Sequence, residues 1–236
     1  FRTIGTVTHP PTSALSATNG TFTGDVGIGT ASPSQKLHVA GNVYNTGFVN
    51  SAGSGTAGGY QFADGNAMIY RATNDLAIKL QGTETLRINA AGIITKPLQP
   101  AFLAHPDSTI TNIATGGNSG LAFDTERFDQ NGDYNNSNYT FTAPVTGKYQ
   151  TNVVMYLIQL DSAVGYYEFS LNTSNKVYYT IVDPDFGQDN AYFTLTFAAL
   201  IDMDAADTAT INLHQQGGSS QTDISSLSMW SMYLVC

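Results

Sequence analysis

Apolar and polar residues alternate in short stretches along the chain, and no window shows the 3.6-residue apolar spacing of an amphipathic helix. Alternation with a period of two is typical of β-strands that bury one face. Asp-Gly, Asn-Asp and Gln-Gly pairs separate the stretches in the first half of the chain and favour tight turns. We therefore predict an all-β protein.

The strand pattern changes at residues 96–100, Lys-Pro-Leu-Gln-Pro. Before this segment the expected strands are short and are separated by stretches rich in Gly, Ser and Thr, at residues 36–39, 60–62, 67–70, 76–80 and 85–88. After it they are longer and more apolar, at residues 101–104, 120–123, 149–160, 165–171, 176–182, 192–201, 208–213 and 228–235. We predict two domains, residues 1–99 and 100–236.

The first domain contains two loosely similar units, residues 25–49 and 60–95. Units this small and this rich in glycine, serine and threonine cannot enclose a hydrophobic core on one chain. Several copies that wind around one axis can do so, which predicts a thin fibre stalk. Residues 1–24 show no periodicity and are expected to be linker or irregular stalk, and residues 51–59 have the composition of a flexible segment.

The second domain has eight expected strands joined by loops rich in Asp, Gly and Asn, which is typical of a β-sandwich and favours a jelly roll. Two of these strands carry large side chains on both faces, with one face expected in the core and the other in a subunit interface. The residues assigned to core or trimer interface are Tyr149, Tyr156, Tyr192, Phe193 and Phe197. A single chain would expose a large apolar patch, and trimerisation would hide it.

Composition excludes several classes of function. Charged residues make up 11% of the chain, against about a quarter in most globular proteins, and the formal net charge is −9 without a basic cluster. Nucleic-acid binding is therefore not expected. No stretch approaches 18 apolar residues, so we expect no membrane insertion. The single cysteine, Cys236, excludes an intrachain disulfide framework.

No catalytic constellation emerges, and we expect neither an enzyme nor a cofactor. The four histidines lie in unrelated segments, and the paired aspartates at 183 and 185 and at 202 and 207 occupy expected turns. Calcium is the alternative left open. Residues 129, 131, 133 and 135 are Asp, Asn, Asp and Asn, with oxygen ligands at alternate positions, but the downstream bidentate glutamate of a calcium loop is missing.

The stretch Asp25-Val-Gly-Ile-Gly-Thr-Ala-Ser-Pro-Ser-Gln-Lys-Leu-His-Val-Ala-Gly41 resembles a repeat common in tail fibres and tail spikes of bacterial viruses. The stretch from Ile69 to Gly92 resembles a unit that often accompanies that repeat. The motif also occurs in some bacterial surface and chaperone-bearing proteins.

Residues 100–236 resemble the C1q-like head, the jelly roll shared with tumour necrosis factor. The matching segments are Pro100-Ala-Phe-Leu-Ala104, Phe128 to Tyr134, Tyr139-Thr-Phe-Thr-Ala-Pro-Val-Thr-Gly-Lys-Tyr149 and Trp230-Ser-Met-Tyr-Leu-Val235. Such heads are homotrimers, as are viral tail fibres, so the resemblance implies a homotrimer located in a virion and therefore extracellular.

We interpret the chain as the distal part of a homotrimeric tail fibre that adheres, without catalysis, to a host surface glycan or protein receptor. The chain begins at Phe1, so we expect a missing N-terminal region that binds other tail proteins. Contact residues are expected on three loops at the far end of the head: Asp161, Asp185, Phe186, Gln188, Asn190, Gln215 and Gln216. The alternatives are a secreted or cell-surface C1q-like adhesive protein and a purely structural virion fibre.

Overall fold

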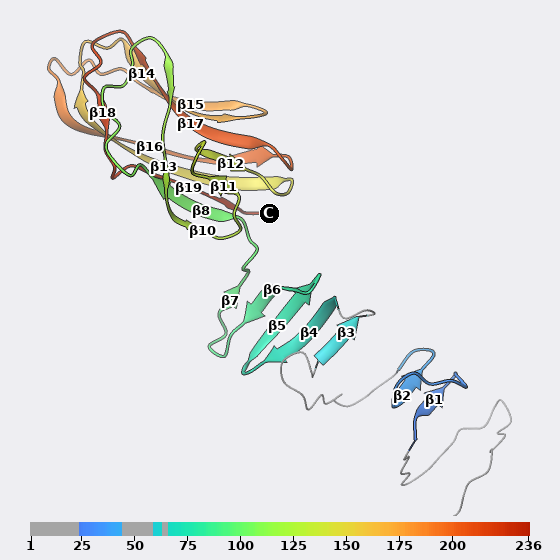
Figure 1. The fold of residues 1–236 in the computed structure, drawn as a ribbon. Helices are drawn as coiled ribbons and strands as arrows, with labels where there is room; N and C mark the ends of the chain where they lie inside the picture. Colours follow the sequence, from blue (N-terminus) through green and yellow to red (C-terminus); the bar gives the residue numbers. More distant parts are fainter. Residues whose placement is uncertain (1–23, 44–58, 63–65) are drawn as a thin grey trace, which may run out of the picture. The chain divides into compact units, whose positions relative to one another are not determined.

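The computed structural model describes residues 24–43, 59–62 and 66–236, and all regular secondary structure in these ranges is β (Figure 1). The chain divides into two units, residues 1–52 and 53–236. Within the described ranges there is no helix with the length and apolar character needed to cross a membrane. Nearly all of the first 24 residues, assigned to linker or irregular stalk, and most of the glycine-rich segment at 51–59 lie outside the described residues.

In the first unit, β1 (Val26–Ile28) pairs with β2 (Leu37–Val39) in parallel. The strand prediction for residues 36–39 is confirmed. β1 is not among the expected strands, because Gly27 and Gly29 locally favour a turn. The side chains of Ile28 and Leu37 are exposed, whereas those of Val26 and Val39 are partly buried.

The second unit begins with a five-stranded antiparallel sheet in sequential order. Its strands are β3 (Gly59–Phe62), β4 (Ala67–Ala72), β5 (Asp75–Leu80), β6 (Thr83–Ile88) and β7 (Ile94–Thr95). The expected Gln-Gly turn is present, since Gln81 and Gly82 have φ angles of 51° and 76°, as a two-residue hairpin loop requires. Leu80 and Ile94 are exposed on this sheet.

The head consists of two further six-stranded sheets. The first sheet has the order β10 (Thr125–Asp129), β8 (Ala101–His105), β19 (Met229–Leu234), β13 (Gly147–Leu160), β16 (Asn190–Met203), and β18 (Asp223–Ile224) also pairs with β13. The second sheet has the order β11 (Tyr134–Asn135), β12 (Thr140–Thr142), β17 (Thr208–Gln216), β14 (Tyr166–Thr173), β15 (Val177–Val182), and β9 (Asn118–Gly120) also pairs with β17.

The chain passes repeatedly between the two sheets: β12 lies in the second, β13 in the first, β14 and β15 in the second, β16 in the first and β17 in the second. This strand order is that of a jelly roll, so the predicted fold of the head is confirmed. The longest pairing joins β13 to β16, from Gly147 opposite Met203 to Leu160 opposite Asn190.

The core of the head lies between the two sheets and is built from alternate residues of each strand. In β13 the five residues expected on one face, Tyr149, Thr151, Val153, Met155 and Leu157, are all buried. At the centre is the Trp230 indole, whose ring lies edge-on to those of Phe102 and Tyr134, with centroids 4.9 and 5.5 Å away. The core is thus complete within one chain.

Several short strands differ from the sequence expectation. The strand expected at residues 120–123 is instead β9, which ends at Gly120, while Leu121 and Phe123 are buried outside any strand. The strands β10, β11, β12 and β18 were not predicted.

The segment that precedes β8 is bonded to the head. The Gln130 side-chain amide donates to the carbonyl oxygens of Lys96 and Gln99. The domain boundary between residues 99 and 100 stays a prediction.

Candidate functional site

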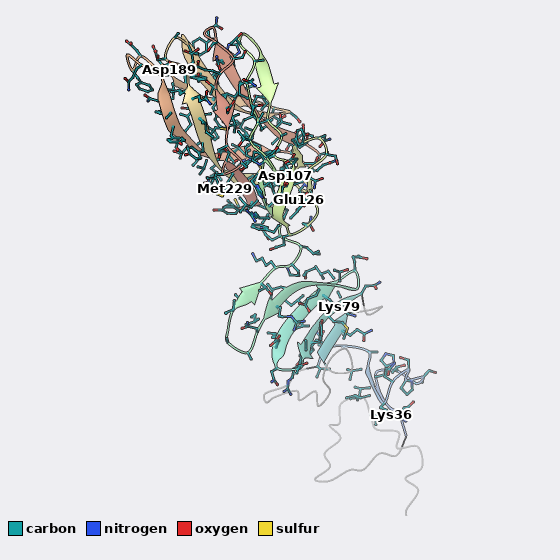
Figure 2. All side chains as sticks on the ribbon, turned by 60° about the vertical axis from the view of Figure 1, so that its left-hand side comes forward. Lys36, Lys79, Asp107, Glu126, Asp189 and Met229 are labelled. Carbon is teal, nitrogen blue, oxygen red and sulfur yellow. The ribbon has the colours of Figure 1, made fainter. Side chains whose placement is uncertain are left out.

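Three loops meet at one end of the head: residues 161–165, 183–189 and 217–222, here called the tip loops. They join β13 to β14, β15 to β16 and β17 to β18. The opposite end of β13 lies beside the C-terminus, because the Lys148 N–H donates to the Cys236 carbonyl over 2.7 Å. A 14-residue strand spans roughly 45 Å, so the tip loops are far from the C-terminal end of β19. Figure 2 shows Asp189 at the end of the head where the tip loops lie, away from Asp107 and Glu126.

Asp161 fastens the first tip loop to the third. Its carboxylate accepts hydrogen bonds from the Ser219 N–H at 2.6 Å, the Ser219 hydroxyl at 2.9 Å and the Ala163 N–H at 2.8 Å. Burial by itself would raise the pKa of Asp161, but the bonds from Ser219 and Ala163 together outweigh it and hold that pKa below its usual value. The carboxylate is therefore ionised at neutral pH and acts as a structural acceptor.

Asp189 fastens the second tip loop to the other two. Its carboxylate accepts from the Gln221 side-chain amide at 2.9 Å and from the Ser162 N–H and hydroxyl at 2.9 and 2.7 Å. The Gln221 bond, followed by those from Ser162, lowers the pKa of Asp189. Each tip loop is therefore bonded to at least one of the others through side chains, which gives a defined surface rather than three independent loops.

The seven expected contact residues fall into two groups. Asp185, Phe186, Gln188 and Gln216 are exposed and Asn190 is half-buried. Asn190 begins β16 and Gln216 ends β17, so these two lie in strands and not in the expected loops. Phe186 packs against Phe193, with ring centroids 5.6 Å apart.

The other two residues require a correction. Asp161 is 4% exposed and Gln215 is fully buried, with the Gln215 amide donating to the carbonyls of Gly217 and Ser219. Neither side chain is accessible to a receptor, because both are buried and hydrogen-bonded to the loops. The residues that sequence reasoning missed are Asp189, Ser219 and Gln221, whose only signal was their position in loops between expected strands.

The loop at which calcium was left open as an alternative is a turn between β10 and β11. The Asp129 carboxylate accepts from the backbone N–H groups of Gly132, Asp133 and Tyr134, at 3.0, 3.2 and 2.9 Å. The Asn131 amide donates to both carboxylate oxygens of Asp133. These oxygens do not fit a hard-cation site, because they are already engaged by the turn. Among the described residues no group of three or more His, Cys, Asp or Glu side chains is placed to hold a metal.

The five residues assigned to core or trimer interface separate into two classes. Tyr149 is buried, and Phe193 and Phe197 pack against the core from β16. Tyr156 and Tyr192 point away from the core, with ring centroids 5.8 Å apart, and Tyr192 is 66% exposed. They belong to the outer face, which we define as the side chains that point away from the core between Gln150 and Ile158 of β13, Tyr192 and Leu200 of β16, and Met229 and Tyr233 of β19: Gln150, Asn152, Val154, Tyr156, Ile158, Tyr192, Thr194, Thr196, Ala198, Leu200, Met229, Ser231 and Tyr233. The next outward pair along β13 and β16 is Lys148 and Asp202, which form an ion pair near the C-terminus.

Acidification is expected to loosen the tip loops before it unfolds the core. The pKa of Asp161 in the folded chain lies below its unfolded value of about 3.9. Its ionised form therefore stabilises the loops above about pH 4, and this stabilisation is lost as the pH falls through the folded pKa. Following the Ser219 amide by NMR should give a midpoint below 3.9, and Asp161→Asn should remove the transition. A midpoint at or above 3.9 would contradict the hydrogen bonding described.

No family model and no curated protein matches the chain. Solved structures that resemble it in part include the following three. The globular domain of zebrafish complement 1qA protein is 14% identical, covers 58% of this chain and 98% of its own length, and has a TM-score of 0.45. Murine APRIL at pH 8.5 is 8% identical, with 58% and 99% covered and a TM-score of 0.43. The PRD1 vertex protein P5 is 13% identical, with 59% and 99% covered and a TM-score of 0.41. The jelly roll is therefore assigned from the strand order of this chain.

Proposed function

We propose that this chain is the distal part of a homotrimeric viral tail fibre, whose head adheres without catalysis to a host surface glycan or protein receptor through its tip loops. The observation that carries the proposal is the outer face. Its 13 residues are uncharged, and the outward charges of β13 and β16 are confined to the Lys148–Asp202 ion pair at the strand ends away from the tip loops. These residues form one side of three strands whose other side already packs in the core.

Large apolar side chains on the outer face are exposed in the single chain. They include Tyr192, Leu200 at 58%, Met229 and Tyr233. In a chain with few charges the absence of charge is a weak signal by itself, but together with exposed tyrosines, leucine and methionine it matches the composition of interface cores. We expect a second copy of this chain to cover the outer face, because Ile28 and Leu37 of the stalk repeat are exposed as well.

Closure of such a fibre head around a threefold axis would place the three outer faces inward and leave the tip loops outward. Three weak contacts on one rigid head gain avidity from their high effective concentration. Attachment to other tail proteins would use a region N-terminal to this chain. The resemblance of residues 25–41 to tail-fibre repeats favours a viral protein over a secreted C1q-like adhesin.

Adhesion predicts that substitutions in the second tip loop and at Asn190, the first residue of β16, weaken binding without unfolding the head. We expect Phe186→Ala, Gln188→Ala and Asn190→Ala together to reduce adsorption of the labelled full chain at least tenfold, measured on a bacterial strain that the wild type binds saturably. The melting temperature should change by only a few degrees, because these residues are exposed or half-buried.

The matched control carries the same types of change outside the tip loops: Phe128→Ala, Asn136→Ala and Asn138→Ala, all at exposed positions. It should adsorb like the wild type. Equal adsorption by both triple variants would exclude the tip loops as the contact surface. Release of oligosaccharides from the cells would make the head an enzyme, and failure to bind any strain would favour a purely structural fibre.

A further inference from the structure

We propose that the head binds one neutral sugar residue in a small polar hollow beside the tip loops, with side chains of Gln159, Asp189 and Asn190 bonding its hydroxyl groups. This inference deepens the proposed adhesive function and rests on it. The hollow has a volume of about 280 Å³ and is lined by Gln159, Asp189, Asn190, Ala191 and Gln221. We call it the tip hollow.

The tip hollow forms where the pairing of β13 with β16 is interrupted. The pairing is continuous as far as Ile158 opposite Tyr192 and resumes at Leu160 opposite Asn190, so Gln159 and Ala191 are skipped without a change of register. Gln159 has a φ of 55°, in the left-handed region that residues other than glycine seldom occupy. Backbone strain of this kind concentrates at functional sites.

The third tip loop holds the backbone of Gln159 in this conformation. The Gln159 carbonyl accepts from the Thr222 hydroxyl at 3.3 Å and the Gln221 amide at 3.5 Å. The same Gln221 amide donates to Asp189. Gln221 therefore joins β13 to the second tip loop, and the walls of the hollow are fixed before any ligand arrives, which lowers the entropy cost of binding.

The tip hollow offers donors and acceptors in the mixture that hydroxyl groups require. Within the described part of the chain, no residue forms a hydrogen bond with the side-chain amide of Gln159 or of Asn190, and each amide can both donate and accept. The Asp189 oxygen that accepts from Gln221 has room for a second donor. A volume just below the usual range for drug-sized ligands, about 300–1,000 Å³, suits a single sugar ring.

The acidic residues around the tip hollow favour a neutral ligand over an anionic one. The tip loops and the strand ends beside them, residues 159–165, 183–191 and 215–223, contain no Lys or Arg. Their charged residues are all acidic: Asp161, Asp183, Asp185, Asp189 and Asp223. Asp189 is kept ionised by its hydrogen bonds and lines the hollow itself. Sialic and uronic acids would meet only like charge, whereas neutral hexoses would not.

The test uses the full chain and saturation-transfer NMR with glucose, galactose, N-acetylglucosamine and rhamnose, and with glucuronic acid and N-acetylneuraminic acid as charged counterparts. We expect saturable binding of at least one neutral sugar and none of the acids. Asn190→Ala and Gln159→Gly should each weaken that binding roughly tenfold, as the loss of a ligand hydrogen bond does. Glycine at 159 adopts the left-handed backbone without strain, so the fold is kept.

The matched control is Asn136→Ala, which removes an exposed side-chain amide far from the tip hollow and should leave sugar binding unchanged. A chain that adsorbs to cells but binds no neutral sugar, or whose Asn190→Ala variant binds sugar normally, would overturn the inference and leave the adhesive function standing. Binding abolished by EDTA and restored by Ca²⁺ would also overturn it. Absence of both adsorption and sugar binding would reject the adhesive function and this inference together.

Discussion

Replacing Trp230 by alanine should lower the melting temperature of the head by roughly 10–20 °C, because about 3–5 kcal/mol of core packing is lost. The indole is fully buried and its ring meets those of Phe102, Phe123 and Tyr134. A single domain is usually stable by only about 5–15 kcal/mol, so this one change removes a large share of the total. Calorimetry or circular dichroism of the full chain would measure it.

Two further variants separate packing from hydrogen bonding. The Trp230 indole N–H donates to the Thr151 hydroxyl over 3.1 Å, and Thr151 is itself fully buried. Thr151→Val should cost about 1–3 kcal/mol because the indole N–H is left unpaired, and Trp230→Phe should cost less than Trp230→Ala because most of the ring volume stays. A melting temperature of Trp230→Ala within about 2 °C of the wild type would show that this cluster is not the core of the head.

The long strands could be predicted because their burial pattern is local. In β13 every second residue from Tyr149 to Leu157 faces the core, and the alternation is legible in the sequence without knowledge of the partner strands. The intervening residues, including Val154 and Tyr156, are large enough to show that the outward face is also apolar. Two-sided apolar strands thus indicated both the sandwich and its outer face.

Short strands could not be predicted because distant partners define them. β12 has three residues, and its pairing is set by Ala209 and Thr208, more than sixty positions away. β1 was missed for a related reason: Gly27 and Gly29 locally favour a turn, and only the parallel pairing with β2 makes this segment a strand. Leu121 and Phe123 alternate like a strand but fill the core as an irregular segment, which the pattern alone does not distinguish.

The tip could be located from strand directions, but its individual contacts could not. Whether an aspartate in a loop faces solvent or another loop depends on partners such as Asp161 and Ser219, which are 58 positions apart in sequence. Gln215 shows the same limit: an amide at the end of an expected strand was assigned to the surface, whereas the structure uses it to bond Gly217 and Ser219. Burial of polar side chains is a tertiary property.

Replacing Tyr156 by aspartate should convert the proposed trimer into folded monomers. In the single chain this side chain points away from the core, so a carboxylate there remains hydrated and the sandwich stays intact. In the proposed trimer the same carboxylate would be buried without a partner in each of three chains, at a cost on the order of 4 kcal/mol or roughly a thousandfold in each association step. Sedimentation should give three times the 25.1 kDa of one chain for the wild type and one chain for the variant.

The control adds the same charge to an exposed apolar residue off the outer face. Val145 lies in the loop between β12 and β13, and Val145→Asp should leave the trimer intact. Tyr156→Phe should also remain trimeric, because the ring and its contact with Tyr192 persist without the hydroxyl. A wild-type chain that sediments as a soluble monomer would refute the trimer. Equal dissociation by Val145→Asp and Tyr156→Asp would show that net charge, rather than the outer face, controls assembly, because a specific interface responds to where a charge is buried.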